Sequence, residues 1–215
     1  MKKLLRNAVA GATAIALFAI SPASLSPMPA DAVDYAKHQL ENYPLYKQSG
    51  NNCWAVTSAT MYSYKSGTTV YKEAMYSKFY DVYGYFPSND SGGITISESV
   101  GLLKHVFEDW RPGTYSVSLY GRYLKQSEIR AQIDSDMPVY LAGSYTNDDG
   151  VTTGHAVALV GYKKSLADGN LYGIYCMNPQ IGEVQYSPYA EDGSHIIKSG
   201  SGSYYYDWIY SITIF

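Results

Sequence analysis

The chain has 215 residues and a formal net charge of −3, from 16 Lys and Arg against 19 Asp and Glu. No basic stripe is present to meet phosphates, so this balance argues against a nucleic-acid partner. Tyrosine accounts for 24 residues; it suits half-buried strands and wet binding surfaces and does not by itself indicate an activity.

The first 32 residues have the order of features typical of a secretory signal peptide. Lys2, Lys3 and Arg6 precede an apolar run over about 8–20, and the small-residue cleavage pattern Ala-Asp-Ala ends at Ala32. The apolar run is short for a membrane anchor, since a span needs roughly 20 apolar residues. Cleavage after Ala32 would remove three basic residues and one acidic residue, leaving 183 residues with a formal net charge of −5. We therefore expect one exported domain over 33–215, released without an anchor.

The front of this domain is predicted to be helical. Residues 33–46 are interpreted as an opening segment with a short helix that ends near Pro44. A polar turn then leads into a buried helix over 53–62, which carries a stripe of small residues. Asn51 or Asn52 would serve as its N-cap.

Two further helices are predicted before the pattern changes. The second covers 70–83, and its expected apolar face consists of Ala74, Met75, Phe79 and Val82. Residues 84–93 are rich in turn formers and predict a loop. Thr95 and Glu98 then have the spacing of a capping box, which predicts a third helix to about Phe107.

The back of the domain is predicted to be mostly strands. A strand over 115–119 and a short helix over 127–135, capped by Ser127, come first. Turns bearing Gly, Asp and Asn then separate the expected strands, which cover 138–142, 155–162, 171–177, 182–186 and 205–215. Helices in front and antiparallel strands behind predict the α+β fold class rather than a doubly wound fold.

Cys53 is the candidate nucleophile, because it lies in the first turn of a predicted helix. Unpaired backbone N–H groups and the helix dipole favour an anion there. Such a position lowers the pKa of a thiol from about 8.5 toward ~3.5–7.5, and a nearby protonated His lowers it further. The thiolate is the working nucleophile, so a base has to come from a distant part of the chain.

His155 is the candidate base among the four histidines. It follows Gly154 and opens the apolar strand over 155–162, where its imidazole would be held rigidly at the edge of a sheet. The other three have no placed partner and are interpreted as solvated or structural: His38, His105 and His195. Two cysteines and one well-placed histidine lack the paired short spacings of a zinc site.

Three segments together resemble the papain-like cysteine peptidases. Residues 52–55 (Asn-Cys-Trp-Ala) resemble their nucleophile segment, and 154–162 (GHAVALVGY) resembles their histidine strand. Asn178, within Met-Asn-Pro, stands where that family places the residue that orients the imidazole, and the order Cys, His, Asn also matches. The Asn-Pro pair and the hairpin over 182–186 look most like the bacterial branch related to bacteriocin leader-processing, or double-glycine, peptidases.

The resemblance implies a two-part papain-like domain that hydrolyses peptide bonds in the cleft between its helical and sheet parts. Cys53 would form a thioester acyl-enzyme, His155 would act as base and acid, and Asn178 would orient the imidazole. Gln48 and the Cys53 backbone N–H would form the oxyanion hole. No metal or organic cofactor is implied. The expected partner is a peptide or protein substrate, and a proteinaceous inhibitor is a further partner that the resemblance allows.

The sequence departs from that family at two points and leaves two other functions open. Gln48 lies one residue nearer the nucleophile than in papain, so Asn51 and Asn52 compete for its role, and no Trp follows Asn178. The first alternative is another cysteine-dependent acyl-transfer enzyme, of a transglutaminase-like or cell-wall amidase-like kind. The second is a non-catalytic, tyrosine-rich binding module stapled by a disulfide between Cys53 and Cys176.

Overall fold

The computed structural model describes residues 34–87, 93–146, 149–192, 194–199 and 202–215. The expected signal peptide and its cleavage site lie outside these residues, as do positions 88–92 of the expected loop. Among the described helices, none combines the length and the apolar character that crossing a membrane requires.

The described residues form four helices and eight strands. In chain order they are β1 (Tyr35–Gln39), α1 (Cys53–Ser66), α2 (Lys72–Tyr83), α3 (Ile96–Trp110), β2 (Val117–Tyr120), α4 (Gln126–Asp134), β3 (Val139–Thr146), β4 (Thr152–Ser165), β5 (Leu171–Asn178), β6 (Glu183–Pro188), β7 (Ser194–Ser199) and β8 (Gly202–Ile214).

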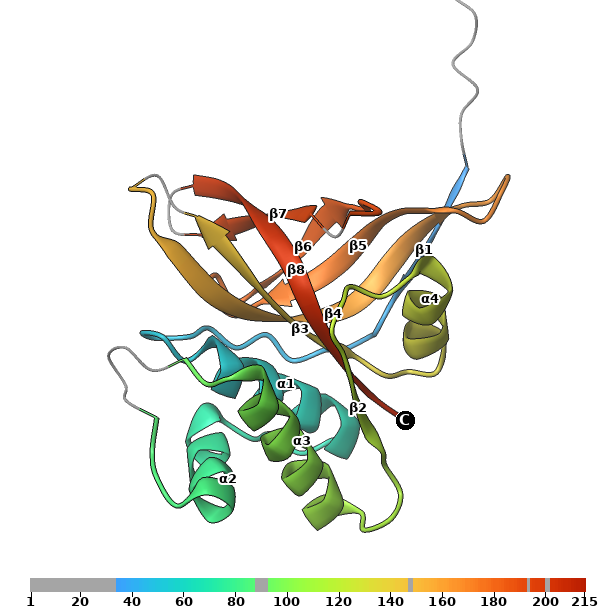
Figure 1. Cartoon of the computed structure of the whole chain (residues 1–215). Helices are drawn as coiled ribbons and strands as arrows, with labels where there is room; N and C mark the ends of the chain where they lie inside the picture. The colour runs from blue at the N-terminus through green and yellow to red at the C-terminus, as the bar shows by residue number, and fades with distance from the viewer. Residues whose placement is uncertain (1–33, 88–92, 147–148, 193, 200–201) are drawn as a thin grey trace, which may run out of the picture. The chain divides into compact units, whose positions relative to one another are not determined.

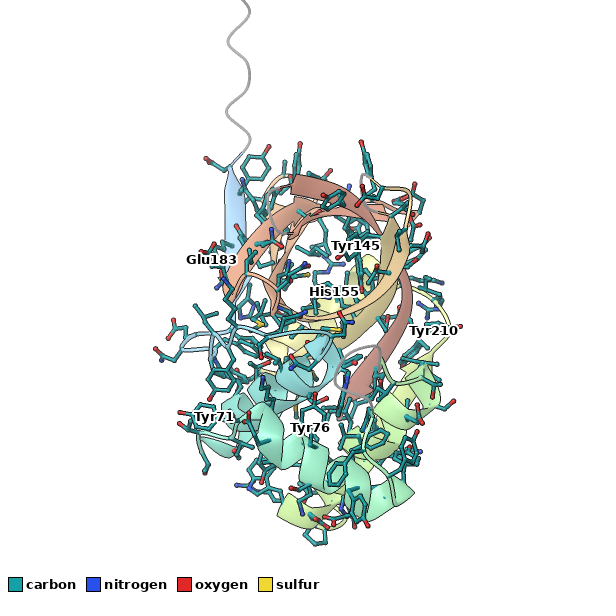
Figure 2. All side chains as sticks on the ribbon, turned by 90° about the vertical axis from the view of Figure 1, so that its left-hand side faces the viewer. Tyr71, Tyr76, Tyr145, His155, Glu183 and Tyr210 are labelled. Carbon is teal, nitrogen blue, oxygen red and sulfur yellow. The ribbon has the colours of Figure 1, made fainter. Side chains whose placement is uncertain are left out.

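All strands join one antiparallel sheet, which runs in the order β2-β8-β3-β4-β5-β6, with β1 paired to β4 and β7 paired to β8. Figure 2 shows the strands curving round into a ring. A hydrogen bond from His195 on β7 to the Pro188 carbonyl on β6, 3.2 Å long, helps to join the two ends of the curve. The prediction of an α+β fold with helices first and an antiparallel sheet behind is confirmed.

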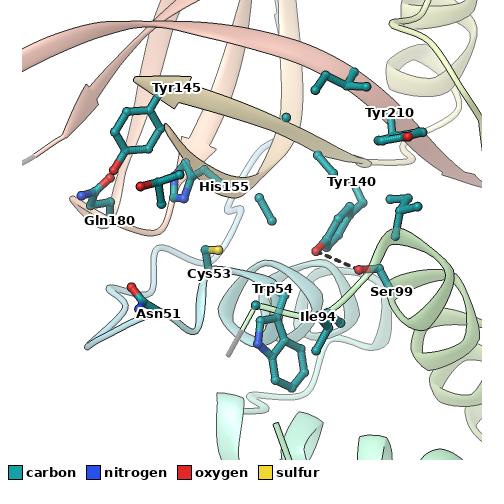
Figure 3. A pocket seen from close by; sticks show the side chains of 18 of the residues that line it. Asn51, Cys53, Trp54, Ile94, Ser99, Tyr140, Tyr145, His155, Gln180 and Tyr210 are labelled. Atoms are coloured by element: carbon teal, nitrogen blue, oxygen red, sulfur yellow. Dashed lines mark hydrogen bonds between the residues drawn. The ribbon is translucent and has the colours of Figure 1, made fainter. Parts of the chain in front are cut away.

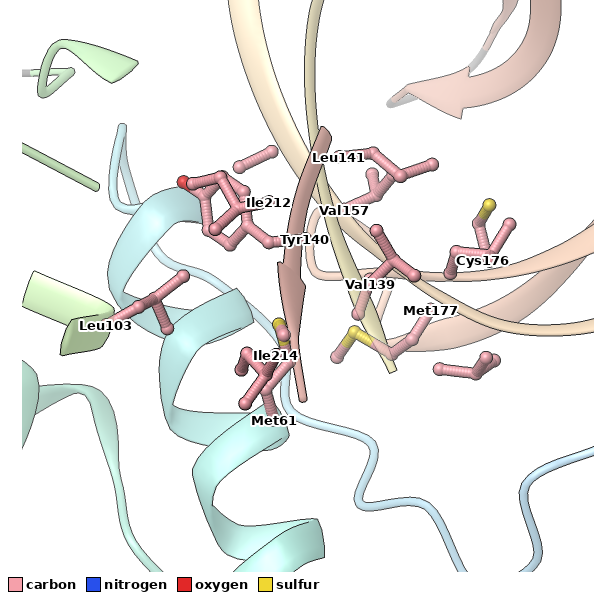
Figure 4. Close-up of a cluster of buried hydrophobic side chains, with 14 of the residues drawn as sticks. Met61, Leu103, Val139, Tyr140, Leu141, Val157, Cys176, Met177, Ile212 and Ile214 are labelled. Atoms are coloured by element: carbon pink, nitrogen blue, oxygen red, sulfur yellow. The ribbon is translucent and has the colours of Figure 1, made fainter. Parts of the chain in front are cut away.

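Helices α1, α2 and α3 gather beside the sheet, and α1 lies nearest to it (Figure 1). Helix α1 is buried along most of its length, because its small residues allow close packing against β4. Thr57 on α1 donates a hydrogen bond of 3.1 Å to the Ala156 carbonyl on β4. The core between the layers joins Met61 and Leu103 from helices with Tyr140 and Ile212 from strands (Figure 4). This packing fixes the start of α1 against the start of β4.

The local signals for the helices are largely confirmed. The capping box of α3 is present, because the Glu98 backbone N–H donates to the Thr95 hydroxyl oxygen and the Thr95 N–H donates to the Glu98 carboxylate. The proposed cap at Ser127 is wrong: α4 begins at Gln126, and the Glu128 carboxylate accepts the Lys125 N–H in front of it. On α2 only two of the four expected apolar residues, Met75 and Phe79, are buried.

Two predictions for the strands are also wrong. Residues 35–39 form strand β1 rather than part of a short helix, because they pair with the far half of β4, which extends to Ser165. No strand is predicted between 186 and 205, yet residues 194–199 form β7, and His195 on that strand is buried. Both errors concern strands that depend on partners distant in the sequence.

Candidate active site

Cys53 is the first residue of α1, as the sequence predicts. Asn52 occupies the N-cap position, but its side chain donates to the Ser49 carbonyl at 2.6 Å instead of capping the helix. The first-turn N–H groups therefore remain available to the thiol, and the backbone of Ala156, Trp54 and Cys53 acts to lower its pKa. Burial is the largest influence and raises the pKa of the Cys53 thiol, so the backbone offsets it only in part.

His155 and Asn178 come together across the β4–β5 pair. The His155 Nε2 lies 2.9 Å from the Asn178 Oδ1, and both side chains are buried. The Gln180 backbone N–H donates to the same Oδ1 at 3.0 Å, which identifies that atom as the amide oxygen. His155 must therefore donate from Nε2, which leaves its Nδ1 without a proton when the ring is neutral. Burial lowers the pKa of His155 to about 4, although the bond to Asn178 raises it.

The backbone that carries His155 is held from two sides. The Tyr206 hydroxyl donates to the His155 carbonyl at 2.9 Å, and Thr57 holds the carbonyl of Ala156. Gly143 stands opposite His155 in the β3–β4 register. A Cβ at Gly143 would lie 2.0 Å from the Asp207 carbonyl oxygen, so only glycine allows this close approach of β3 and β8.

Cys53 and His155 line a cavity of about 620 Å³. Figure 3 shows the Cys53 sulfur beneath the imidazole, with Tyr145 and Gln180 on one side of the ring and Tyr140 on the other. The cavity has polar lining residues in Gln48, Asn51 and Gln180 and apolar ones in Ile94, Ile96, Ala142 and Ile209. An elongated substrate would therefore meet two chemically different groups of residues around the thiol.

Gln48 lines this cavity, and its backbone N–H donates to the Pro179 carbonyl at 2.7 Å. That bond ties the segment before the nucleophile to the turn that follows Asn178. The Gln48 side chain donates from Nε2 to the Gly50 carbonyl at 2.9 Å. Asn51 also lines the cavity, whereas Asn52 donates to the Ser49 carbonyl and is buried outside the cavity. Of the two alternatives to Gln48, only Asn51 therefore lines the cavity that contains the thiol.

The two cysteines are both free, so the Cys53–Cys176 disulfide of the second alternative is wrong. Cys176 is buried in β5, and burial raises the pKa of its thiol to about 12.

His38 lies 2.6 Å from an Asp134 carboxylate oxygen, and His105 lies 3.5 Å from Asp109. Over the described residues, no group of three or more His, Cys, Asp or Glu side chains could hold a metal ion.

Sequence reasoning missed two side chains beside the His155–Asn178 pair. Tyr145 stands edge-on to the imidazole, with ring centroids 6.1 Å apart and an interplanar angle of 87°. It is 9% exposed and lies beside Gln180, where it helps to cover the imidazole (Figure 3). Gln185 on β6 accepts a hydrogen bond of 2.6 Å from the Asn178 Nδ2. Gln185 belongs to the hairpin over 182–186, but that local pattern does not indicate its contact with Asn178, and no motif indicates Tyr145, because both reach the site through strand register.

A family model described as the Peptidase_C39 like family matches residues 40–195. The match covers more than half of the chain and includes Cys53, His155 and Asn178. No curated protein matches the chain. The chain therefore belongs to the Peptidase_C39 like family, in agreement with the resemblance seen in its sequence.

Proposed function

We propose that this member of the Peptidase_C39 like family is an exported cysteine peptidase that hydrolyses peptide bonds through a thioester on Cys53. The 2.9 Å bond between His155 Nε2 and Asn178 Oδ1 is the observation that carries the proposal. Cys53 and His155 line the same cavity, and the sulfur lies beneath the imidazole (Figure 3), so the thiol lies beside this pair. Three distant segments thus bring together a nucleophile, a base and an orienting amide.

The position of the proton on the imidazole supports this assignment. Because Nε2 donates to Asn178, Nδ1 has a free lone pair and can take the proton of the Cys53 thiol. Burial disfavours each charge by itself, since it raises the pKa of Cys53 and lowers that of His155 to about 4. A thiolate and an imidazolium that form together stabilise one another, and the backbone of Ala156, Trp54 and Cys53 favours the thiolate further.

The reaction then follows in two halves. The thiolate attacks the scissile carbonyl carbon, and the π electrons of the carbonyl move to its oxygen, which accepts from the Cys53 N–H and from Gln48. Collapse of this intermediate breaks the C–N bond, and the leaving amine takes the proton from His155 Nδ1. Water then attacks the thioester, gives a proton to His155, and releases the acid and the thiol.

The orientation of the substrate follows from the groups around the thiol. The oxyanion would point toward the Cys53 N–H and Gln48, and the leaving nitrogen toward His155. The acyl chain is left to run along the wall formed by Ile94, Ala142 and Ile209, which line the same cavity. Apolar side chains on the acyl side of the scissile bond are therefore expected to contact these three residues.

Export through the signal peptide is part of the proposal. The first described strand begins at Tyr35, so cleavage after Ala32 would leave every described element in place. Mass spectrometry of the protein recovered from the medium would then give an N-terminus at Val33. An N-terminus at Met1 on protein retained in the cells would contradict export.

Labelling with an E-64-type epoxide at neutral pH tests the peptidase assignment. Mass spectrometry of the non-reduced protein should show a single adduct on Cys53, and the adduct should be absent in His155→Ala. Cys176→Ala is the matched control and should label as the unmodified protein does. Equal labelling of Cys53 with and without His155, or no labelling at all, would contradict an activated thiolate.

A further inference from the structure

The amide of Asn178 has a hydrogen-bond partner at each end. Its Oδ1 accepts from His155 Nε2 at 2.9 Å and from the Gln180 N–H at 3.0 Å. Its Nδ2 donates to the Gln185 Oε1 at 2.6 Å. The side chain has no exposed surface, so water cannot replace these partners.

These partners select one of the two orientations of the amide. If the amide turned over, its NH₂ group would face two donors, and its oxygen would face the oxygen of Gln185. Each mismatch leaves a buried polar group unsatisfied, which is more costly than the loss of one hydrogen bond. Gln185 supplies the side-chain oxygen that accepts from the Asn178 Nδ2.

Strand register explains how Gln185 reaches this position. Asn178 on β5 is paired with Glu183 on β6, and Gln185 is paired with Cys176. Gln185 and Asn178 are therefore diagonal neighbours on one face of the sheet, within reach of long side chains. Gln185 is not among the residues that line the cavity, so it does not contact the substrate space directly.

We propose that Gln185 is a positioning residue that acts on His155 through Asn178. By accepting from Nδ2, it keeps the Asn178 oxygen turned toward the imidazole. The imidazole then carries its proton on Nε2 and keeps Nδ1 free to act as base. The inference rests on the role of His155 proposed above, and it adds a fourth residue to the Cys53, His155 and Asn178 set.

Gln185→Met and Gln185→Glu test this role as a pair. Methionine keeps the length of the side chain but lacks an amide or carboxylate oxygen, whereas glutamate keeps an acceptor for Nδ2. Gln185→Met should lower the rate of Cys53 alkylation by iodoacetamide at neutral pH by roughly tenfold, with a KM for peptide substrate close to that of the unmodified protein. Gln185→Glu should keep the alkylation rate of Cys53 within about threefold of that of the unmodified protein, because a charged acceptor also serves the Nδ2 donor.

Imidazole nitrogen NMR of ¹⁵N-labelled protein supplies a readout that a merely structural role would not move. In the unmodified protein, neutral His155 should carry its proton on Nε2, and Gln185→Met should gain a population with the proton on Nδ1. In an Asn178→Ala background, Gln185→Met should have no further effect, because the two act through one amide. Thermal unfolding of each variant identifies any that fails to fold, and Gln185→Leu, which also lacks an acceptor, then replaces Gln185→Met in the NMR comparison.

Two results would overturn the inference, and a third concerns the proposed function instead. The first is a Gln185→Met protein with unchanged alkylation rate and tautomer, and the second is a full additional loss in the Asn178→Ala background. If the unmodified protein itself alkylates no faster than a free thiol and does not depend on His155, the peptidase assignment fails. In that case the NMR tautomer still decides whether Gln185 orients Asn178.

Discussion

The two cysteines occupy regions of the molecule that give one side chain opposite properties. Cys53 lies at the start of α1 and lines the cavity, and the backbone of Ala156, Trp54 and Cys53 acts to lower the pKa of its thiol. Cys176 lies within β5 at 8% exposure, and burial alone raises the pKa of its thiol to about 12. The comparison indicates that backbone donors and access to the cavity distinguish the reactive position, since burial raises the pKa of both thiols.

Two buried histidines, His155 and His195, differ in the same way. His155 and His195 are both buried on strands, at 6% and 4% exposure, and burial lowers the pKa of each. His155 meets an amide at Nε2 and lines the cavity. His195 donates from Nδ1 to the Pro188 carbonyl and packs against the rings of Trp208 and Tyr189. Only His155 combines a fixed tautomer with access to the thiol.

Removal of each thiol in turn gives the largest expected difference between the two regions. Cys53→Ala should lower kcat/KM for peptide hydrolysis by at least about 10⁴-fold, because no other group can form the acyl-enzyme. Cys176→Ala should keep kcat/KM within about twofold and lower the free energy of unfolding by ~1 kcal/mol, since one buried atom is lost. Steady-state kinetics and urea unfolding measure both. A comparable loss of kcat/KM in both variants would show that Cys53 is no more important for hydrolysis than Cys176.

The second expected difference is a loss of stability on acidification in the Cys53→Ala protein. Without a thiolate partner, His155 resists protonation, and its pKa falls from 6.5 in the unfolded chain to about 4 in the fold. The unfolded state binds more protons between these values, so stability is complete above pH 6.5 and is lost as pH falls toward 4. The loss amounts to about 3 kcal/mol by pH 4.

A double variant isolates this effect from the carboxylates, which also titrate in acid. Cys53→Ala with His155→Gln keeps a donor for Asn178 but has no ionisable group at this position. Urea unfolding from pH 7 down to about pH 4 should show a shallower decline for the double variant than for Cys53→Ala. Parallel curves for the two proteins would show that His155 does not titrate as its burial implies.

How far the sequence predicted the site depends on the range of each interaction. The start of α1 at Cys53 and the capping box of Thr95 and Glu98 are local features, and both were predicted. Strand β1 was not, because residues 35–39 become a strand only by pairing with the far half of β4. Gln185 and Tyr145 were missed for the same reason, since strand register and curvature bring them to the pair. Resemblance supplied the Cys–His–Asn set, which lies on three segments that no local rule connects.

The smallest expected effect concerns neighbouring positions on β3 that face the cavity and the core. Ala142 lines the cavity, whereas Leu141 is 1% exposed. Ala142→Phe should narrow the cavity beside Ile209. It should lower kcat/KM about tenfold for peptides with a large apolar residue on the acyl side, compared with peptides that have glycine at that position. Leu141→Ala is the matched control and should lower the free energy of unfolding by ~2–5 kcal/mol with this preference unchanged. A preference that shifts in both variants would show that selectivity follows general stability; a shift only in Ala142→Phe would assign this wall to the acyl side of the substrate.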